Sequence, residues 1–323
     1  MIKTVILDDW EQATSQPSIH LDRLRQFSDV HIYHDQPSIE TTKQRVQDAD
    51  AVILMRERTK LTADLLDSMK QIKLIAQTGT GLAHIDMDAV NRRKIPVATT
   101  PGGSTAAVTE LTFAFLLSLA RDLHRLSRQV KKGEWPPSIG LNLAKKTLGL
   151  IGLGKIGQSV AQVAKAFGMR VIAWGPRLTP ERAEAAGVEY VSLEDLLNQS
   201  HFLSLHVRLV PATKNLLRRE HFELMRPDAC LINTSRGELI DEEALIWALH
   251  NQKVRGAGLD VFHREPLDPQ HPLLQLDNVI LSPHIGWKTD NTFESFLNGS
   301  IANIESFFQQ KQPQNIANQE AIG

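Results

Sequence analysis

Three polar residues late in the chain follow apolar, strand-like segments and have side chains suited to acid–base chemistry on a small anion. They are Arg236 in "INTSRGELID", Glu265 in "GLDVFHREPL" and His284 in "LSPHIGW". An arginine fork fixes a carboxylate in one geometry. A histidine titrates near neutral pH, and an adjacent carboxylate raises the pKa of such a ring and orients it. Together these types can hold a carboxylate and move a proton beside it.

A glycine-rich turn earlier in the chain has the pattern of a dinucleotide site. An apolar strand is expected at 147–151, followed by Gly152-x-Gly154-x-x-Gly157 and a helix that Lys155 and Ile156 open. Gly152 permits the tight turn, Gly154 lets the backbone approach a pyrophosphate, and Gly157 lets helix and strand pack closely. Free N–H groups at the helix start face phosphates. An idle turn is the alternative, but the strand–turn–helix order favours a dinucleotide.

The segment "VIAWGPR" at 171–177 lacks the acidic residue that holds the ribose of NAD about twenty residues past such a turn. Gly175 occupies that position, and Arg177 follows. Without the acid the 2′-phosphate of NADP is not repelled, and Arg177 can pair with it. The alternative is a solvated Arg177 with NAD bound through weaker ribose contacts. The cofactor is therefore NAD or NADP, with NADP slightly favoured.

The elements that position these residues form two series in which β-branched runs alternate with amphipathic stretches. This alternation indicates parallel sheets flanked by helices. We expect an α/β protein of two Rossmann-like doubly wound sheets, joined at a hinge in "TTPGGST" (99–105) and separated by a cleft. The expected strands are TVILDD, VHIYH, AVILMR, KLIAQTG, IPVATT, TLGLIGLG, RVIAW, EYV, HFLSLHV, ACLINTS, GAGLDVF and NVILSPH.

Ligands of doubly wound sheets bind beyond the carboxyl ends of the strands, so Arg236, Asp260, Glu265 and His284 should converge there. Hydride transfer between a nicotinamide and a hydroxy acid needs such a carboxylate clamp and proton donor. Taken singly, each residue also has a structural explanation, as a loop, turn or strand-end residue.

One long helix is expected from about 105 to 132. Its basic second half, "RDLHRLSRQVKK", is interpreted as a solvated face rather than an anion site.

Composition limits the class of protein. The 323 residues are 42% hydrophobic and 23% charged, with a net charge of −1, as in globular proteins without a nucleic-acid surface. Cys230 is the single cysteine, which suits a reducing cytosol and a buried thiol. The N-terminus lacks a signal-peptide pattern, and the most apolar segment, 111–120, is about half the length that spans a bilayer. We expect a cytoplasmic chain with neither a membrane nor a nucleic-acid partner, and no metal site.

The order "GLGKIG", "NTSRGELIDEEAL", "GAGLDVFHREPL", "LSPHIGW" resembles the D-isomer-specific 2-hydroxyacid dehydrogenase family. This family includes phosphoglycerate dehydrogenases and glyoxylate/hydroxypyruvate reductases. The resemblance extends over almost the whole chain, through "TGTGLAHIDM", "TPGGSTAAVTELTFAFLLSLAR" and "KKGEWPP". Gly175 is the departure from the family pattern.

The resemblance implies roles for individual residues. Arg236 would anchor the substrate carboxylate, His284 would donate the proton in reduction, and Glu265 would assist it. Asp260 would hold the nicotinamide carboxamide, with Thr234 and Ser235 near the cofactor. The backbone N–H groups of Gly79, Thr80 and Gly81 would receive the substrate carboxylate. Arg56 in "LMRERT" reaches the cleft mouth or is a solvated loop residue, and Trp287 walls the pocket or packs at the domain seam.

The resemblance also implies a discontinuous substrate domain, 1–101 plus 289–323, around a dinucleotide-binding domain, 102–288. The helix at 105–132 would contribute to a homodimer. The expected activity is NAD(P)H-dependent reduction of a small 2-oxo acid such as hydroxypyruvate or glyoxylate, or the reverse reaction. The alternative is a dinucleotide-sensing co-regulator of the same fold with little turnover.

Overall fold

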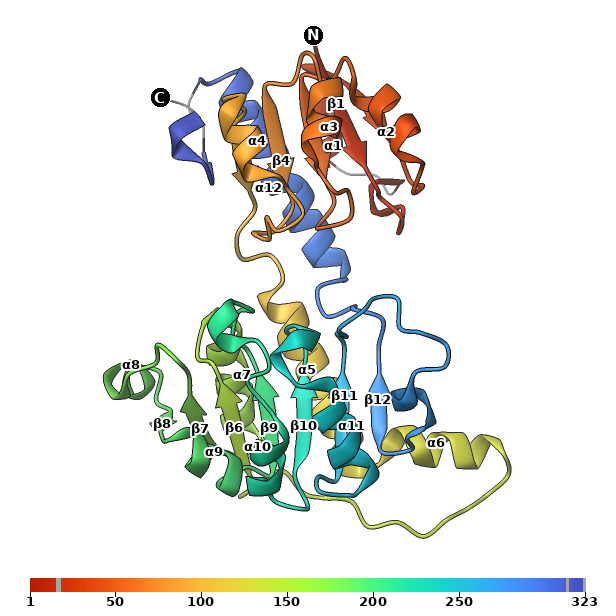
Figure 1. Ribbon diagram of the computed structural model, residues 1–323, viewed down its shortest axis with the longest axis vertical. Helices are drawn as coiled ribbons and strands as arrows, with labels where there is room; N and C mark the ends of the chain where they lie inside the picture. Colours follow the sequence, from red (N-terminus) through yellow and green to blue (C-terminus); the bar gives the residue numbers. More distant parts are fainter. Residues whose placement is uncertain (16–18, 312–313, 322–323) are drawn as a thin grey trace. The chain divides into compact units, whose positions relative to one another are not determined.

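The computed structural model describes residues 1–15, 19–311 and 314–321, and the chain forms two compact units (Figure 1). Unit 1 comprises Met1–Ser104 and Lys288–Gly323, and unit 2 comprises Thr105–Trp287. That unit 1 receives the substrate and unit 2 the dinucleotide stays a prediction. Residues 16–18, 312–313 and 322–323 of the expected substrate domain lie outside the described residues.

Unit 1 is built on a five-stranded parallel sheet with the order β2-β1-β3-β4-β5. The strands are β1 (Ile2–Leu7), β2 (Ser28–Ile32), β3 (Ala51–Leu54), β4 (Leu74–Gln77) and β5 (Val97–Thr99). The neighbouring strands β3 and β4 are buried at every position. This burial explains the apolar sequence of β3 and of the first three residues of β4.

Helices cover both faces of this sheet. They are α1 (Ile19–Arg25), α2 (Ile39–Val46), α3 (Ala63–Ser68), α4 (Met87–Arg92) and α12 (Asp290–Phe308). On one face, Leu297, Ile301 and Ile304 of α12 pack with Leu24 of α1 against strand residues such as Ile6. The α2, α3 and α4 helices contribute to the core on the other face. The C-terminal segment therefore completes a sheet that the N-terminal segment begins.

Unit 2 contains a seven-stranded parallel sheet with the order β12-β11-β10-β9-β6-β7-β8. The strands are β6 (Thr147–Ile151), β7 (Arg170–Trp174), β8 (Glu189–Tyr190), β9 (Phe202–Leu205), β10 (Cys230–Asn233), β11 (Gly256–Leu259) and β12 (Val279–Leu281). The strand order reverses between β6 and β9, the crevice where doubly wound sheets bind ligands. Each sequence segment expected to be a strand contains one of these twelve strands or overlaps it.

The helices of unit 2 also lie on both faces of its sheet. They are α5 (Thr105–Arg121), α6 (Leu123–Lys131), α7 (Lys155–Ala166), α8 (Pro180–Ala185), α9 (Leu193–Gln199), α10 (Arg219–Leu224) and α11 (Glu242–His250). One core joins α5, α7 and α8 to the sheet, and a second joins α9, α10 and α11. Cys230 is buried in the first core, and burial raises the pKa of its thiol to about 12.

The expected continuous helix at 105–132 is wrong, because the chain breaks at Asp122. This residue adopts a left-handed conformation with φ 53°, which ends α5 and redirects the chain into α6. The Asp122 carboxylate accepts a hydrogen bond from Arg125 Nε at 2.6 Å, which favours the break. Helix α6 contains no buried residue.

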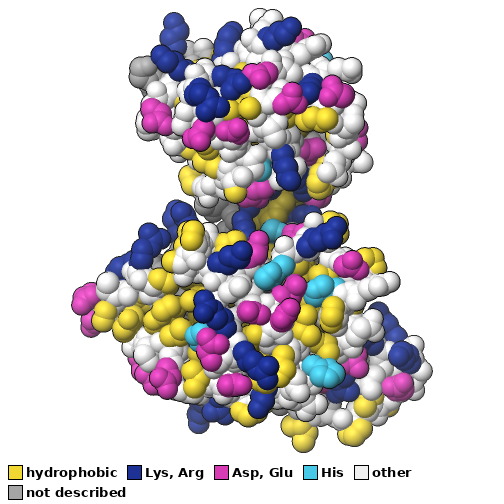
Figure 2. All heavy atoms as spheres, in the orientation of Figure 1, with side chains coloured by type: hydrophobic (Ala, Val, Ile, Leu, Met, Phe, Trp, Pro, Cys, Tyr) yellow, Lys and Arg dark blue, Asp and Glu magenta, His cyan; other side chains and the backbone are white. Residues whose placement is uncertain are grey.

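Within the residues that the structure describes, no helix is long and apolar enough to cross a membrane. Basic and acidic side chains are interspersed on the face shown in Figure 2.

Candidate active site

The glycine turn lies between β6 and α7 as expected, and each glycine has a distinct steric environment. Gly152 has φ +103°, and a Cβ there would lie 2.7 Å from the carbonyl oxygen of His206. A Cβ on Gly157 would collide with the carbonyl oxygen of Gly152. Gly154 is the N-cap of α7, and nothing lies within 4 Å of a Cβ built on it. This open space, beside the N–H groups of Lys155 and Ile156 in the first helical turn, fits an approaching pyrophosphate.

The position expected for a ribose acid lies directly beside this turn. A Cβ on Gly175 would be 3.5 Å from Leu178 Cβ and 3.6 Å from Gly152 Cα, both ordinary van der Waals distances. Arg177 is exposed two residues further on, and its carbonyl oxygen accepts a hydrogen bond from Arg182 Nη1 at 2.9 Å. Arg177 therefore lies in the loop after β7, and Arg182 of the following helix α8 contacts its backbone.

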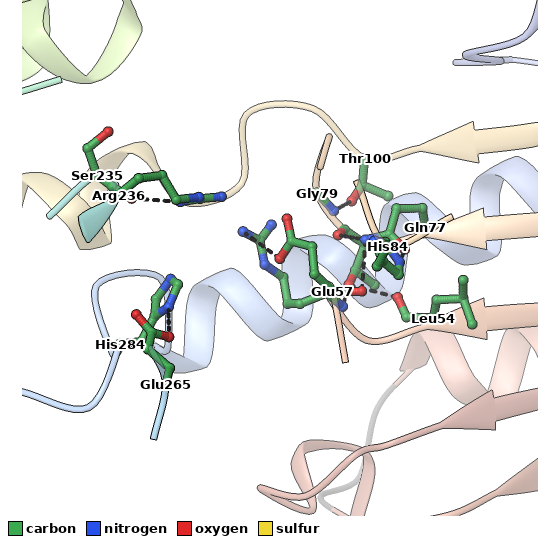
Figure 3. Close-up of polar contacts among 12 residues, drawn as sticks. Leu54, Glu57, Gln77, Gly79, His84, Thr100, Ser235, Arg236, Glu265 and His284 are labelled. Carbon is green, nitrogen blue, oxygen red and sulfur yellow. Dashed lines mark hydrogen bonds and ion pairs between the residues drawn. The ribbon is translucent and has the colours of Figure 1, made fainter. Parts of the chain in front are cut away.

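His284 and Glu265 form the predicted pair. His284 Nδ1 lies 2.7 Å from Glu265 Oε2, and Glu265 Oε1 accepts a hydrogen bond from the Phe262 N–H at 3.0 Å (Figure 3). Burial acts to raise the pKa of Glu265, but the hydrogen bond and charge of His284 outweigh it and the pKa is lowered. Glu265 is thus held as a carboxylate acceptor that orients the imidazole.

Asp260 holds the backbone that carries His284. One carboxylate oxygen accepts from the Ser282 hydroxyl and from the Ile285 N–H at 2.8 Å, and the other accepts from the Gly286 N–H at 2.8 Å. Burial raises the pKa of Asp260 against the opposing effect of these hydrogen bonds. His284 itself has φ 52°, an uncommon conformation for a non-glycine residue. The sequence did not indicate this role of Asp260.

Arg236 follows β10 and joins the same cluster. Its Nη1 donates to the carbonyl oxygen of Ser235 at 2.7 Å, and its charge contributes to the lowered pKa of Glu265 (Figure 3). The Ser235 hydroxyl donates to the Val207 carbonyl at 2.7 Å, and Thr234 Oγ1 lies 3.3 Å from Thr112 Oγ1. The structure therefore brings Arg236, Glu265 and His284 together at the carboxyl ends of the parallel strands β10, β11 and β12.

In unit 1, the Gly79–Gly81 loop follows β4. The N–H of Gly79 donates to Thr100 Oγ1 at 2.6 Å and is therefore engaged within the protein. Thr80 is exposed and Gly81 is half-buried. That the backbone N–H groups of Gly79, Thr80 and Gly81 receive a substrate carboxylate stays a prediction.

The loop after β3 places Arg56 and Glu57 against the same glycines. A Cβ on Gly79 would collide with the Arg56 guanidinium, and a Cβ on Gly81 with the Glu57 carboxylate. Arg56 also lies 5.5 Å from the Phe296 ring centroid, so it packs within unit 1 rather than extending into solvent. Sequence reasoning missed Glu57, although residues that follow neighbouring parallel strands share one edge of the sheet.

The sequence also predicted a role for Trp287 and the absence of a metal site. Trp287 is buried, and its role at a pocket wall stays a prediction. Among residues 1–15, 19–311 and 314–321, no group of three or more His, Cys, Asp or Glu side chains is placed to hold a metal ion.

A doubly wound sheet with this glycine turn, and with an Arg–Glu–His cluster at its carboxyl edge, defines a dinucleotide-dependent dehydrogenase. Residues 113–286 match the sequence model described as "D-isomer specific 2-hydroxyacid dehydrogenase, NAD binding domain". The glyoxylate reductase of Thermococcus litoralis is 36% identical over 317 residues, which cover 95% of each chain. The chain belongs to the D-isomer-specific 2-hydroxyacid dehydrogenase family.

Other relatives have related names. The hydroxypyruvate reductase of Thermotoga maritima is 43% identical over 242 residues, covering 74% of this chain and 78% of the relative. A D-3-phosphoglycerate dehydrogenase of Methanocaldococcus jannaschii is 42% identical over 250 residues, but these are only 47% of its length. The solved structure of an acyclic imino acid reductase (Bsp5) with NADPH and D-Arg has a TM-score of 0.83 at 31% identity, covering 98% of this chain and 99% of that one.

These findings establish the class of reaction. The chain is an oxidoreductase, a D-2-hydroxyacid dehydrogenase that uses a nicotinamide dinucleotide. They do not support the alternative of a dinucleotide-sensing co-regulator.

Proposed function

We propose that this enzyme reduces a small 2-oxo acid, hydroxypyruvate or glyoxylate, to the D-2-hydroxy acid, with NADPH preferred over NADH. The observation that carries the proposal is the 2.7 Å contact between His284 and Glu265 in the cluster that also contains Arg236. Relatives named glyoxylate reductase and hydroxypyruvate reductase support this substrate class.

The residues act as follows. In unit 2, Arg236 is proposed to pair with the substrate carboxylate, and in unit 1 the backbone N–H groups of Thr80 and Gly81 are proposed as carboxylate donors. A nicotinamide dinucleotide held by the glycine turn would supply the hydride that the carbonyl carbon receives. Because Glu265 holds Nδ1 of His284, the Nε2 atom is directed to the substrate and donates the proton to the carbonyl oxygen. The Glu265 carboxylate keeps the ring in that orientation during the transfer.

The first test is His284→Asn. We expect kcat for hydroxypyruvate reduction to fall by about 10²–10⁴-fold, the usual contribution of a general acid, with NADPH binding retained in a fluorescence titration. His250→Asn is the matched control, because His250 is exposed at the end of α11 and should leave turnover at the wild-type value. Retention of wild-type turnover in His284→Asn would overturn the proposed role.

The cofactor is proposed to lie on the glycine turn, with Thr234, Ser235 and Asp260 beside its nicotinamide end. NADPH preference rests on the absent acid at Gly175 and on Arg177 in the same loop. The solved structure of Bsp5 in complex with NADPH supports this choice of cofactor.

Two opposite variants test this preference. Arg177→Ala should lower kcat/KM with NADPH by about tenfold or more, the worth of one charge-assisted contact, and leave NADH unchanged. Gly175→Asp restores the absent acid at a position where a Cβ makes only ordinary van der Waals contacts, and it should instead favour NADH. Exposed Arg25→Ala in α1 is the control. An unchanged NADPH/NADH ratio in both variants would make NADP preference wrong.

A homodimer is proposed from the apolar surface that α6 and the following segment expose. Leu123 is 60% exposed and Val130 48%, while Trp135 and Ile139 are 88% and 94% exposed. A second copy of the chain would cover these side chains. Leu123→Glu with Val130→Glu should shift the sedimentation mass from dimer to monomer, and a wild-type monomer would contradict the proposal.

A further inference from the structure

The Gly79–Gly81 loop of unit 1 is covered by side chains of opposite charge from the neighbouring strand end. Strands β3 and β4 are parallel neighbours, so the residues that follow them lie at the same edge of the sheet. The Arg56 guanidinium occupies the space beside Gly79, and the Glu57 carboxylate occupies the space beside Gly81. An anion bound on this loop would therefore lie near groups of opposite charge.

Backbone contacts fix the placement of this pair. Arg56 has φ 60°, its N–H donates to Thr78 Oγ1 at 2.7 Å, and its carbonyl oxygen accepts from Gln77 Nε2 at 3.0 Å. The Thr78 hydroxyl in turn donates to the Leu54 carbonyl at 2.9 Å. A left-handed non-glycine residue at a candidate site is strain that the surrounding structure maintains. These contacts fix the backbone conformation of Arg56 and so the position of Glu57, which follows it.

The net charge around the loop is what distinguishes one class of substrate from another. Arg56 Nη2 and Glu57 Oε2 are 3.8 Å apart, so the cation is already partly compensated. Arg58 does not add a second charge here, since its guanidinium donates to the Asp8 carbonyl at 2.6 Å and to Glu11 at 2.7 Å. His84 contacts Gln77 Oε1 at 3.1 Å. Burial lowers the pKa of His84 against the opposing charge of Glu57, the Arg56 charge adds to the lowering, and the neutral ring is favoured.

We infer that Glu57 is a specificity-determining residue: it rejects 2-oxo acids with an anionic tail and accepts those with a hydroxyl or cationic tail. The inference rests on the proposed function of the loop as the carboxylate site. One carboxylate is matched by Arg56, but a further phosphate would meet the Glu57 carboxylate at close range, and such like-charge contact disfavours a competing ligand. A hydroxyl or guanidinium would instead donate a hydrogen bond to Glu57.

The test compares Glu57→Gln with wild type on three substrates: hydroxypyruvate, its 3-phosphate ester and a 2-oxo acid with a guanidinium tail. In the variant, the ratio of kcat/KM for the phosphate ester to that for hydroxypyruvate should rise by about tenfold or more, and the ratio for the guanidinium acid should fall similarly. Glu40→Gln in α2, an exposed residue that pairs with Lys43, removes the same charge elsewhere and should change neither ratio. Unchanged ratios in Glu57→Gln would overturn the inference.

A binding readout separates this inference from the proposed function. Calorimetry of D-glycerate and 3-phospho-D-glycerate with the dinucleotide-loaded protein should show the phosphorylated ligand gaining about tenfold in affinity only in Glu57→Gln. If none of the 2-oxo acids were reduced, the proposed function would fail, while this affinity ratio would still decide the role of Glu57. Equal affinity ratios in wild type and variant would exclude it.

Discussion

The two glycine loops of the molecule are crowded by different kinds of atom. In unit 2, the turn after β6 is packed against backbone: a Cβ on Gly152 or Gly157 would meet the carbonyl oxygen of His206 or of Gly152. In unit 1, the loop after β4 is packed against the ends of two flexible side chains, Arg56 and Glu57. The first environment cannot adjust to a substitution, whereas the second can.

This difference corresponds to two kinds of recognition. Backbone N–H groups at a helix start recognise any pyrophosphate and are the same whatever the neighbouring side chains are. Side chains over a loop recognise charge and shape, and one substitution changes both. The comparison indicates that dinucleotide binding is a rigid property of this chain and that the choice of 2-oxo acid is adjustable.

The largest effect is expected for Gly157→Ala. Its Cβ would collide with a backbone oxygen that cannot move independently, so the free energy of unfolding should fall by about 3 kcal/mol or more. Gly154→Ala is the matched variant: the space around it is open, so its thermal midpoint should match wild type while NADPH affinity falls. Thermal denaturation and fluorescence titration measure the two quantities. Wild-type affinity in Gly154→Ala would show that the open space does not receive the pyrophosphate.

Each glycine loop also lies near a histidine whose pKa is lowered by burial, and these histidines make stability pH-dependent. Burial lowers the pKa of His206 from 6.5 to about 4, and it also lowers the pKa of His84 below 6.5. At pH values between 6.5 and about 4, His206 binds a proton in the unfolded chain but not in the folded chain. The free energy of unfolding therefore decreases as pH falls through this range. For His206 the loss is about 3 kcal/mol.

Urea unfolding at pH 7 and pH 4.5 measures this loss. The decrease in unfolding free energy between the two pH values should be smaller in His206→Asn than in wild type, and His84→Asn should reduce it less. The same decrease in all three proteins would contradict the assignment.

Asp260→Asn tests whether the His284 loop is as rigid as the glycine turn. An asparagine offers one acceptor oxygen, so the N–H groups of Ile285 and Gly286 cannot both be satisfied. We expect the free energy of unfolding to fall by about 1–3 kcal/mol and kcat to fall with it. Ser282→Ala removes only the hydroxyl contact and should have a smaller effect on both. If Asp260→Asn retained wild-type stability and kcat, Asp260 would not hold this loop.

The smallest effect is expected for Gly81→Ala, where only the end of Glu57 must move. Its unfolding free energy should remain within about 1 kcal/mol of wild type, although the preference between neutral and phosphorylated 2-oxo acids should change. Gly79→Ala should be less stable than Gly81→Ala, because Gly79 has φ +81°. Denaturant unfolding of both variants checks the order, and equal losses would contradict the side-chain origin of the crowding at Gly81.

Much of the fold could be predicted because both sheets are parallel and buried on both faces. Such strands are short apolar runs bounded by breakers, and the motifs of the site follow them directly. Asp122 could not be predicted, since the helical pattern continues across a single left-handed residue whose contact with Arg125 is local. Nothing in the residue order alone shows this break.

The roles of Glu57 and Asp260 needed the three-dimensional structure. Glu57 matters because β3 and β4 are neighbours in the order β2-β1-β3-β4-β5, and strand order is not readable from one sequence. Asp260 matters because its oxygens reach two N–H groups that converge only in the observed loop conformation. Residue type predicted that these positions were polar, but not which atoms they bind.

The return of α12 to the sheet of unit 1 has a consequence for synthesis on the ribosome. Leu297, Ile301 and Ile304 cover one face of a sheet whose strands are complete by Thr99, and Asn318 accepts a hydrogen bond from the Val97 N–H at 2.8 Å. All of unit 2 is translated between these two segments. Unit 1 can therefore finish folding only after unit 2 and α12 have been made, and its apolar face must be protected until then.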